Sequence, residues 1–150
     1  MRTIQRDIVA AVIVSKDEKI LQGLGVPDGV YPGCWRIPGG GIETGESREE
    51  ALIREVLEET GIDIASYSLE LVDDSETGVS EKTLRETDEK VLCEMHFIDY
   101  RIEIPYNAEN IPLKPADDII ECRWVALDDL KKLPLTPPSE KLFRKLGYIK

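Results

Sequence analysis

Apolar residues recur along this chain with two spacings, one typical of strands and one typical of helices. Short apolar runs rich in valine and isoleucine, and one long segment of alternating apolar and polar residues, predict strands. The expected strands cover residues 8–15, 20–24, 34–37, 64–72, 91–104 and 119–126. The polar, strongly charged stretch 73–90 predicts a surface loop.

The clearest helix covers residues 48–60, because the sequence marks both of its ends. Ser47 and Glu50 have the spacing of a capping box, and Gly61 followed by Ile62 is a glycine stop. At about 100° per residue, one side of this helix carries mainly apolar residues and should face the core. That side consists of Leu52, Ile53, Val56, Leu57 and Thr60.

Two shorter helices are expected near the end of the chain. Residues 127–132 form the first, which Pro134 ends, and Pro137 and Pro138 open the second. The apolar stripe of the second consists of Leu142, Phe143 and Leu146. Strands and helices in this order predict an α/β fold in which helices flank a mixed β-sheet, an α/β/α sandwich.

Three glutamates, Glu55, Glu58 and Glu59, share a separate arc of the helix 48–60, with Ala51 in its middle. Like charges at this spacing each destabilise a helix by roughly 0.2–0.5 kcal/mol. We expect the arc to be exposed, so that a divalent cation can approach past the small Ala51 side chain and reverse the repulsion. Carboxylate oxygens are ligands that Mg²⁺ and Mn²⁺ prefer. A solvated acidic helix face is the alternative interpretation.

Pro38 and three consecutive glycines, Gly39, Gly40 and Gly41, precede this helix. We expect a loop that approaches other groups closely and lends them a backbone amide or carbonyl. The glycines do not complete a GxGxxG fingerprint, and the chain contains no GxxxxGK[ST] motif. The loop therefore belongs with the acidic helix.

Composition narrows the function classes. With 150 residues, we expect a single domain over 1–150. The net charge of −11 argues against binding a nucleic acid polymer through its phosphates. No apolar run approaches the roughly 20 residues of a membrane-spanning helix, and the N-terminus lacks the apolar segment of a signal peptide. We therefore expect a cytoplasmic protein without membrane contact, and three cysteines without paired spacing agree with reduced thiols.

Residues 40–62 follow one extended pattern. It reads Gly, five residues, Glu, seven residues, Arg-Glu, an aliphatic residue, any residue, Glu-Glu, any residue, Gly and an aliphatic residue. The fixed positions are Gly40, Glu46, Arg54, Glu55, Val56, Glu58, Glu59, Gly61 and Ile62. In this pattern the chain resembles the Nudix hydrolase family of MutT-like pyrophosphohydrolases. Segment 35–39 resembles the family's usual lead-in, and segment 124–129 resembles its exit strand and turn.

The resemblance implies Mg²⁺-dependent hydrolysis of a phosphoanhydride bond in a nucleoside diphosphate linked to another moiety, with Mn²⁺ as the alternative metal. The family pattern implies metal ligands at Glu55, Glu58 and Glu59 and at the backbone carbonyl of Gly40. Glu58 is implied either as a ligand or as the group that activates water. Metal ions would screen the substrate phosphates, and a neighbouring glutamate would accept a proton from water.

Arg54 matches the family residue that orients Glu55 through an ion pair, with Glu46 as its supporting partner. The catalytic candidates are therefore Glu55, Glu58 and Arg54. The general base varies within the family, so Asp118, Glu121 and the acids of 73–90 stay open as bases.

Substrate contacts are less defined by the sequence. Arg36, Trp35, Asp118 and Glu121 are the candidate substrate-binding residues, and Trp35, Tyr31 or Tyr106 could stack on a base. Markers of the subfamilies that cleave ADP-ribose, dinucleoside polyphosphates and NADH are missing. What remains is a nucleoside triphosphate, common or modified, that yields a nucleoside monophosphate and pyrophosphate.

Three other functions stay open. A nucleotide sensor could keep the fold without hydrolysis, although it would not need three crowded glutamates. A prenyl-diphosphate isomerase shares the fold and would use a reactive cysteine, for which Cys34 is the candidate. A purely acidic interaction domain would show no metal dependence. The expected partner is a small-molecule nucleotide substrate, and a homodimer stays open.

Overall fold

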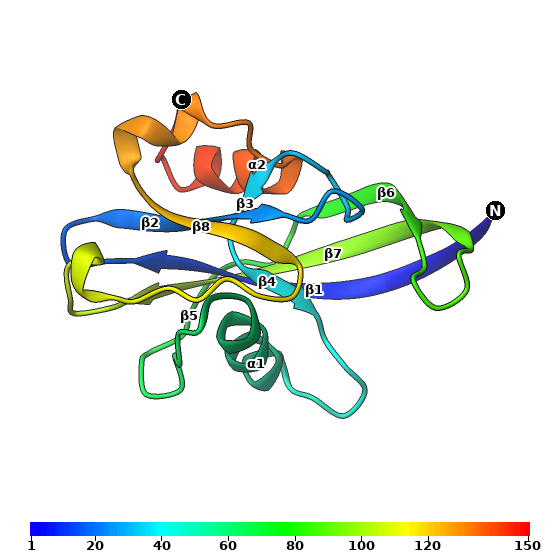
Figure 1. Ribbon diagram of the computed structural model, residues 1–150, viewed down its shortest axis with the longest axis horizontal. Helices are drawn as coiled ribbons and strands as arrows, with labels where there is room; N and C mark the ends of the chain where they lie inside the picture. Colours follow the sequence, from blue (N-terminus) through cyan, green and yellow to red (C-terminus); the bar gives the residue numbers. More distant parts are fainter.

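Strand β1 (Arg2–Val14) lies at the centre of an eight-stranded sheet in the computed structural model, which describes all 150 residues (Figure 1). All 13 residues of β1 pair in parallel with β7 (Lys90–Glu103). The other strand pairs are antiparallel. The predicted mixed sheet is therefore confirmed.

The remaining strands extend the sheet on both sides of this central pair. β2 (Lys19–Gly25) lies between β1 and β8 (Ile119–Ala126). Short strands complete the sheet, and they are β3 (Trp35–Arg36), β4 (Gly39–Gly41), β5 (Glu70–Asp73) and β6 (Thr77–Thr83). β5 and β6 both pair with β7, while β3 pairs with β2.

The neighbour of β1 changes along its length. β1 pairs with β2 at Val14, whereas β4 pairs with the segment from Ile8 to Ala10. The Ala11 N–H also donates to the carbonyl of Pro38 at 2.9 Å. The glycine segment is thus inserted into the sheet beside β1, and it is not the loop that we expected.

Alternation along β1 and β7 gives the sheet two apolar faces, each covered by a helix (Figure 1). α1 (Arg48–Thr60) covers one face and α2 (Pro137–Lys145) the other. The α1 side contains Val9, Ala11, Ile13, Leu52, Val56, Ile98, Tyr100 and Ile102. The α2 side contains Ala10, Val12, Val14, Leu142 and Phe143. This arrangement confirms the α/β/α sandwich.

Local signals located the helices well. The Ser47 hydroxyl accepts the Glu50 N–H, the Glu50 side chain accepts the Ser47 N–H, and Gly61 ends α1 with φ of 79°. Leu57, expected on the core side, is instead 47% exposed because it lies at the margin of the apolar stripe.

Two 3₁₀ helices, η1 (Ala108–Asn110) and η2 (Leu127–Lys132), complete the fold. Neither α-helix has the length and apolar character needed to cross a membrane.

Two expectations were wrong. Residues 64–72 do not form one strand, because the Asp63 carboxylate accepts the Ala65 N–H and starts a turn that leaves only β5 extended. The stretch 73–90 is not a loop throughout, because it contains β6. β6 alternates between exposed and half-buried residues, but its buried side is made of small and polar side chains, so its hydrophobic period is weak.

Candidate active site

The glutamates of α1 lie against the glycine strand β4. Ala51, Glu55 and Glu59 recur every four residues and form one stripe that borders the apolar stripe of the helix. Ala51 is 0% and Glu59 is 1% exposed, so the expectation of an exposed acidic arc was wrong for both. The physical reason is β4, whose three glycines have no side chains to hold the helix away.

Each glycine of β4 faces a different neighbour. A Cβ atom added to Gly40 would lie 2.5 Å from the Glu55 carboxylate oxygens. One added to Gly39 would lie 2.7 Å from the Cα atom of Ala10, and one added to Gly41 would lie 2.7 Å from the Arg6 guanidinium carbon. The backbone of Gly40 is therefore in direct contact with the carboxylate of Glu55.

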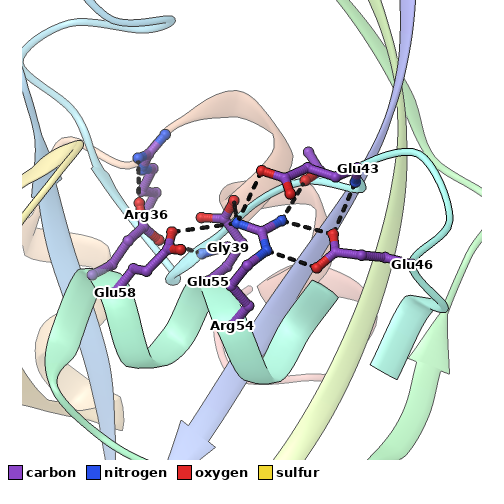
Figure 2. A network of polar contacts seen from close by, with 9 residues as sticks. Arg36, Gly39, Glu43, Glu46, Arg54, Glu55 and Glu58 are labelled. Carbon is purple, nitrogen blue, oxygen red and sulfur yellow. Dashed lines mark hydrogen bonds and ion pairs between the residues drawn. The ribbon is translucent and has the colours of Figure 1, made fainter. Parts of the chain in front are cut away.

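The guanidinium of Arg54 lies among several glutamate side chains and connects them into one network (Figure 2). Its guanidinium donates to both carboxylate oxygens of Glu46, at 2.7 and 2.9 Å, and to the carbonyl of Gly41 at 3.2 Å. It also donates to Glu55 at 2.9 Å and to Glu58 at 3.3 Å. Hydrogen bonding from Arg54 lowers the pKa of Glu46 to about 2.

Glu55 and Glu58 differ in their surroundings. Burial raises the pKa of Glu55 above its ordinary value, although Arg54 opposes this shift. Glu58 is 43% exposed on its side chain and reaches solvent. The structure thus brings Arg54, Glu46, Glu55 and Glu58 into one network, with Glu55 on the inner side and Glu58 on the outer side.

Glu59 is the most buried acid of the chain. Its carboxylate accepts the Gly39 N–H at 2.8 Å and an Arg36 N–H at 3.2 Å. Burial raises its pKa to about 8, and the charges of Glu55 and Asp118 raise it further, while Arg36 and Gly39 lower it. The hydrogen bonds from Gly39 and Arg36 therefore do not offset the cost of burying the charged carboxylate.

A cavity of about 480 Å³ opens beside this network. Gly40 and Glu55 contribute to its wall, Ile8 and Phe97 come from the central strands, and Tyr31 comes from the loop after β2. This volume falls within the range of small-molecule sites, roughly 300–1,000 Å³. The acidic network and a ligand-sized cavity therefore meet at Glu55.

The candidate substrate-binding residues divide into two groups. Arg36 and Asp118 line the cavity, although Asp118 is paired with Arg85 at 2.7 Å. Trp35 lies outside the lining with the Arg123 guanidinium over its ring, 4.8 Å from its centre. Glu121 also lies outside and pairs with Arg123 at 2.5 Å.

Of the candidates for base stacking and for isomerase chemistry, only one lines the cavity. Tyr31 lines the cavity, whereas Tyr106 is exposed on the surface and away from it. Cys34 is half-buried and does not line the cavity. The geometry therefore offers no support to a cysteine-dependent isomerase.

Three residues of the cavity wall were missed in the sequence. Arg6 and Lys82 line the cavity without forming an ion pair, and burial together with the nearby Arg6 charge lowers the pKa of Lys82. Asp99 lies on the same wall at the end near α2. The sequence does mark Asp99, because it is the one acid among the four residues from Phe97 to Tyr100 in a strongly apolar strand. In the sequence, neither Arg6 nor Lys82 differs from an ordinary surface cation.

The donor atoms of the network suit a divalent cation, but their arrangement is not that of a formed metal centre. No group of three or more His, Cys, Asp or Glu side chains converges on one point. Glu55 and Glu58 instead face Arg54, and Glu59 faces Arg36. Carboxylates and a backbone carbonyl are hard oxygen donors. Burial disfavours the charged forms of Glu55 and Glu59 and raises their pKa values, and a bound cation would stabilise those charged forms.

Comparisons with known proteins agree with this geometry. The family model described as NUDIX domain matches residues 5–146. The nucleoside triphosphatase NudI of Enterobacter sp. (strain 638) is 46% identical over 57 residues, which cover 38% of this chain and 40% of that protein. NudI of Escherichia coli (strain K12 / DH10B) is 47% identical over 57 residues, again 40% of its length. The matched segment thus spans less than half of these relatives.

Solved structures extend the likeness to nearly the whole chain. The MutT protein from Methanosarcina mazei Go1 has a TM-score of 0.62 and 25% identity, covering 97% of this chain and 94% of that one. The dihydroneopterin triphosphate pyrophosphohydrolase of E. coli has a TM-score of 0.65 and 18% identity, covering 95% and 96% of the two chains. At that identity the second likeness concerns the fold alone.

Proposed function

Since the chain belongs to the Nudix family, we propose that it hydrolyses a nucleoside triphosphate, common or modified, to a nucleoside monophosphate and pyrophosphate with the aid of Mg²⁺ or Mn²⁺. The observation that carries this proposal is the position of Glu55. Its carboxylate touches the Gly40 backbone, is held by Arg54, and forms part of the wall of the ligand-sized cavity. The acidic chemistry and the space for a substrate meet there.

The choice of a triphosphate rests on two further points. Arg6 and Lys82 are unpaired cations on the cavity wall of a chain whose net charge is −11, so they provide local attraction for an anionic substrate. The relatives with 46–47% identity over part of the chain are named as nucleoside triphosphatases. Both points favour phosphate-rich substrates.

Glu55, Glu58 and Glu59 and the carbonyl of Gly40 would hold the divalent cation. When bound, such an ion neutralises charge on phosphate oxygens and lowers the pKa of water. The protein's own groups prepare the site: Arg54 fixes the Glu55 carboxylate and is itself fixed by Glu46. Arg36 and the Gly39 N–H fix Glu59 from the opposite side.

Glu58 is the residue that we propose for accepting the proton of the attacking water. It is the member of the network most open to solvent, and its contact with Arg54, at 3.3 Å, is the longest of the four hydrogen bonds that Arg54 donates to glutamates. A carboxylate in this position can turn toward water more readily than the buried Glu59. General-base catalysis of this kind contributes typically 10²–10⁴-fold to a rate.

The proposal is tested by product analysis over a panel of substrates with Mg²⁺. The panel contains the four common ribonucleoside and deoxyribonucleoside triphosphates, 8-oxo-purine triphosphates, ADP-ribose, NADH and a dinucleoside tetraphosphate. We expect equal amounts of nucleoside monophosphate and pyrophosphate from at least one triphosphate. Release of inorganic phosphate with a diphosphate, or turnover of the linked dinucleotides alone, would contradict the proposal.

A further inference from the structure

Asp99 is a buried acid at the end of the cavity opposite to the cations Arg6 and Lys82. On β7 it follows Cys93, Met95 and Phe97 at steps of two residues, and all four line the cavity. Asp99 pairs with Ala10 of β1, which pairs with Gly39 of β4. Asp99 therefore lies two strand spacings, about 10 Å, from the glycine strand against which Glu55 rests.

The carboxylate of Asp99 has no partner within the protein. The residue is only 5% exposed, and no N–H or O–H group donates to its carboxylate. The cation whose charge acts on Asp99 is Lys145, which is already bound to Asp73 at 3.3 Å and to Glu76 at 2.5 Å. Burial and the neighbouring acids raise the pKa of Asp99 to about 7. The Asp99 oxygens are not among the buried side-chain atoms without a hydrogen-bond partner, so they are accessible from the cavity that the residue lines. An acid held in a largely buried place with its acceptors free is a candidate for binding a ligand that supplies N–H groups.

Apolar side chains line the cavity beside Asp99 and offer a surface on which a ring can pack. Ile8 and Phe97 are paired neighbours on its floor, and Tyr31 and Val30 pack against the same cluster. A carboxylate only accepts hydrogen bonds, and its two oxygens match two adjacent N–H donors. Among nucleobases, the 2-amino-6-oxo edge of guanine presents two such donors, whereas adenine and cytosine combine an amino group with an acceptor, and uracil has a single N–H between two carbonyls.

We propose that Asp99 is the specificity-determining residue of this site and accepts both N–H donors of a 2-amino-6-oxopurine ring, so that guanine nucleotides are preferred over the other three. This inference rests on the proposed function, because it assumes that the ring belongs to the substrate whose phosphates reach Glu55. It adds the identity of the base. A site built to pair with two donors discriminates strongly against a ring that lacks one, since a buried acceptor is then left unpaired.

Binding of nucleoside monophosphates tests the inference without requiring turnover or metal. GMP, IMP, AMP, CMP and UMP are titrated calorimetrically into the wild-type protein, Asp99→Asn and Asp73→Asn. Asp99→Asn keeps the shape of the side chain and removes one acceptor and the charge. Asp73 pairs with Asp99 across the strands and its charge raises the pKa of Asp99, but Asp73 does not line the cavity. Asp73→Asn therefore changes the charge around Asp99 while keeping both Asp99 acceptors, and it controls for electrostatics alone.

We expect wild type to bind GMP at least 10-fold more tightly than AMP, CMP and UMP, and several-fold more tightly than IMP, which lacks the 2-amino donor. Asp99→Asn should weaken GMP binding 10-fold or more and change the other ligands less than about 3-fold, while Asp73→Asn keeps the preference. Equal weakening of all ligands, unchanged GMP binding, or wild-type binding of IMP as tight as GMP would overturn the inference.

The wild-type comparison of GMP with IMP decides the matter even if Asp99→Asn does not fold. The inference and the proposed function also fail separately. Hydrolysis without a guanine preference would remove only the assignment of Asp99. A guanine preference in binding without any hydrolysis would remove the proposed function and leave Asp99 as the residue that selects the ligand.

Discussion

Alanine substitution at the three consecutive glycines of β4 should produce three different defects, because each glycine faces a different group. At Gly40 the new methyl carbon would lie 2.5 Å from the Glu55 carboxylate oxygens, about 1 Å closer than an ordinary contact. Glu55 must move by about that distance, and a displacement of 1 Å in a catalytic group can reduce a rate about 10²-fold. Overpacking of this kind destabilises a protein by about 1–3 kcal/mol, partly offset by the removal of a flexible glycine.

At Gly39 the new methyl carbon would meet backbone, 2.7 Å from the Cα atom of Ala10. Backbone cannot rotate away, so β4 must separate from β1 and withdraw the amide that Gly39 donates to Glu59. Each lost hydrogen bond contributes about 1 kcal/mol, and a buried acid left without its donor about 1–3 kcal/mol more. We therefore expect Gly39→Ala to lose about 2–4 kcal/mol of stability.

At Gly41 the obstacle is the end of a flexible side chain, the guanidinium of Arg6. Arg6 can rotate, so stability should change by less than about 1 kcal/mol, and the effect should be a higher KM because Arg6 lies on the cavity wall. Urea unfolding and steady-state kinetics of the three variants separate these outcomes. Gly40→Ala with wild-type kcat/KM, or equal destabilisation by all three substitutions, would refute the reasoning.

Three other predictions concern the network and the core. Replacing Arg54 by Lys should lower kcat at least 10-fold, because a lysine cannot hold Glu46 at two oxygens and Glu55 together, and a kcat equal to wild type would contradict this. The raised pKa of Glu59 means that its contribution to stability is fully present below about pH 4.5 and is lost as the pH rises through about 8. Asp99 and Glu55 also have raised pKa values and lose stability over this range in both proteins. Metal-free urea unfolding between pH 4.5 and 9 should therefore show a larger loss in wild type than in Glu59→Gln, and parallel curves would contradict it. Leu52→Asp should prevent folding because Leu52 is fully buried, whereas Leu57→Asp at an exposed position should shift the melting temperature only slightly, as circular dichroism can show.

The sequence predicted what depends on local signals. The capping box at Ser47 and the glycine stop at Gly61 determine both ends of α1 within the helix itself, so its bounds were correct. The burial of Glu59 could not be read in the same way, because it depends on a glycine strand that joins the sheet through β1. The alternation of β6 was hidden by polar side chains, since its partner β7 supplies the apolar surface.

The site likewise combines residues that are close in sequence with residues that only the fold brings together. Arg54 and the glutamates stand close together in sequence, and a family pattern connects them. The cavity wall combines segments far apart in the chain, so Arg6, Lys82 and Asp99 have no shared pattern in sequence and only the folded structure brings them together.

The most direct measurement is the rate of pyrophosphate release from a nucleoside triphosphate as a function of Mg²⁺ concentration, for wild type and Glu55→Gln in parallel. The wild-type rate should rise from zero in EDTA to saturation with Mg²⁺, and Glu55→Gln should lose at least 10²-fold in kcat while its urea midpoint stays near that of wild type. Undiminished turnover in Glu55→Gln, or turnover in wild type that EDTA does not abolish, would contradict a metal-dependent hydrolase centred on Glu55.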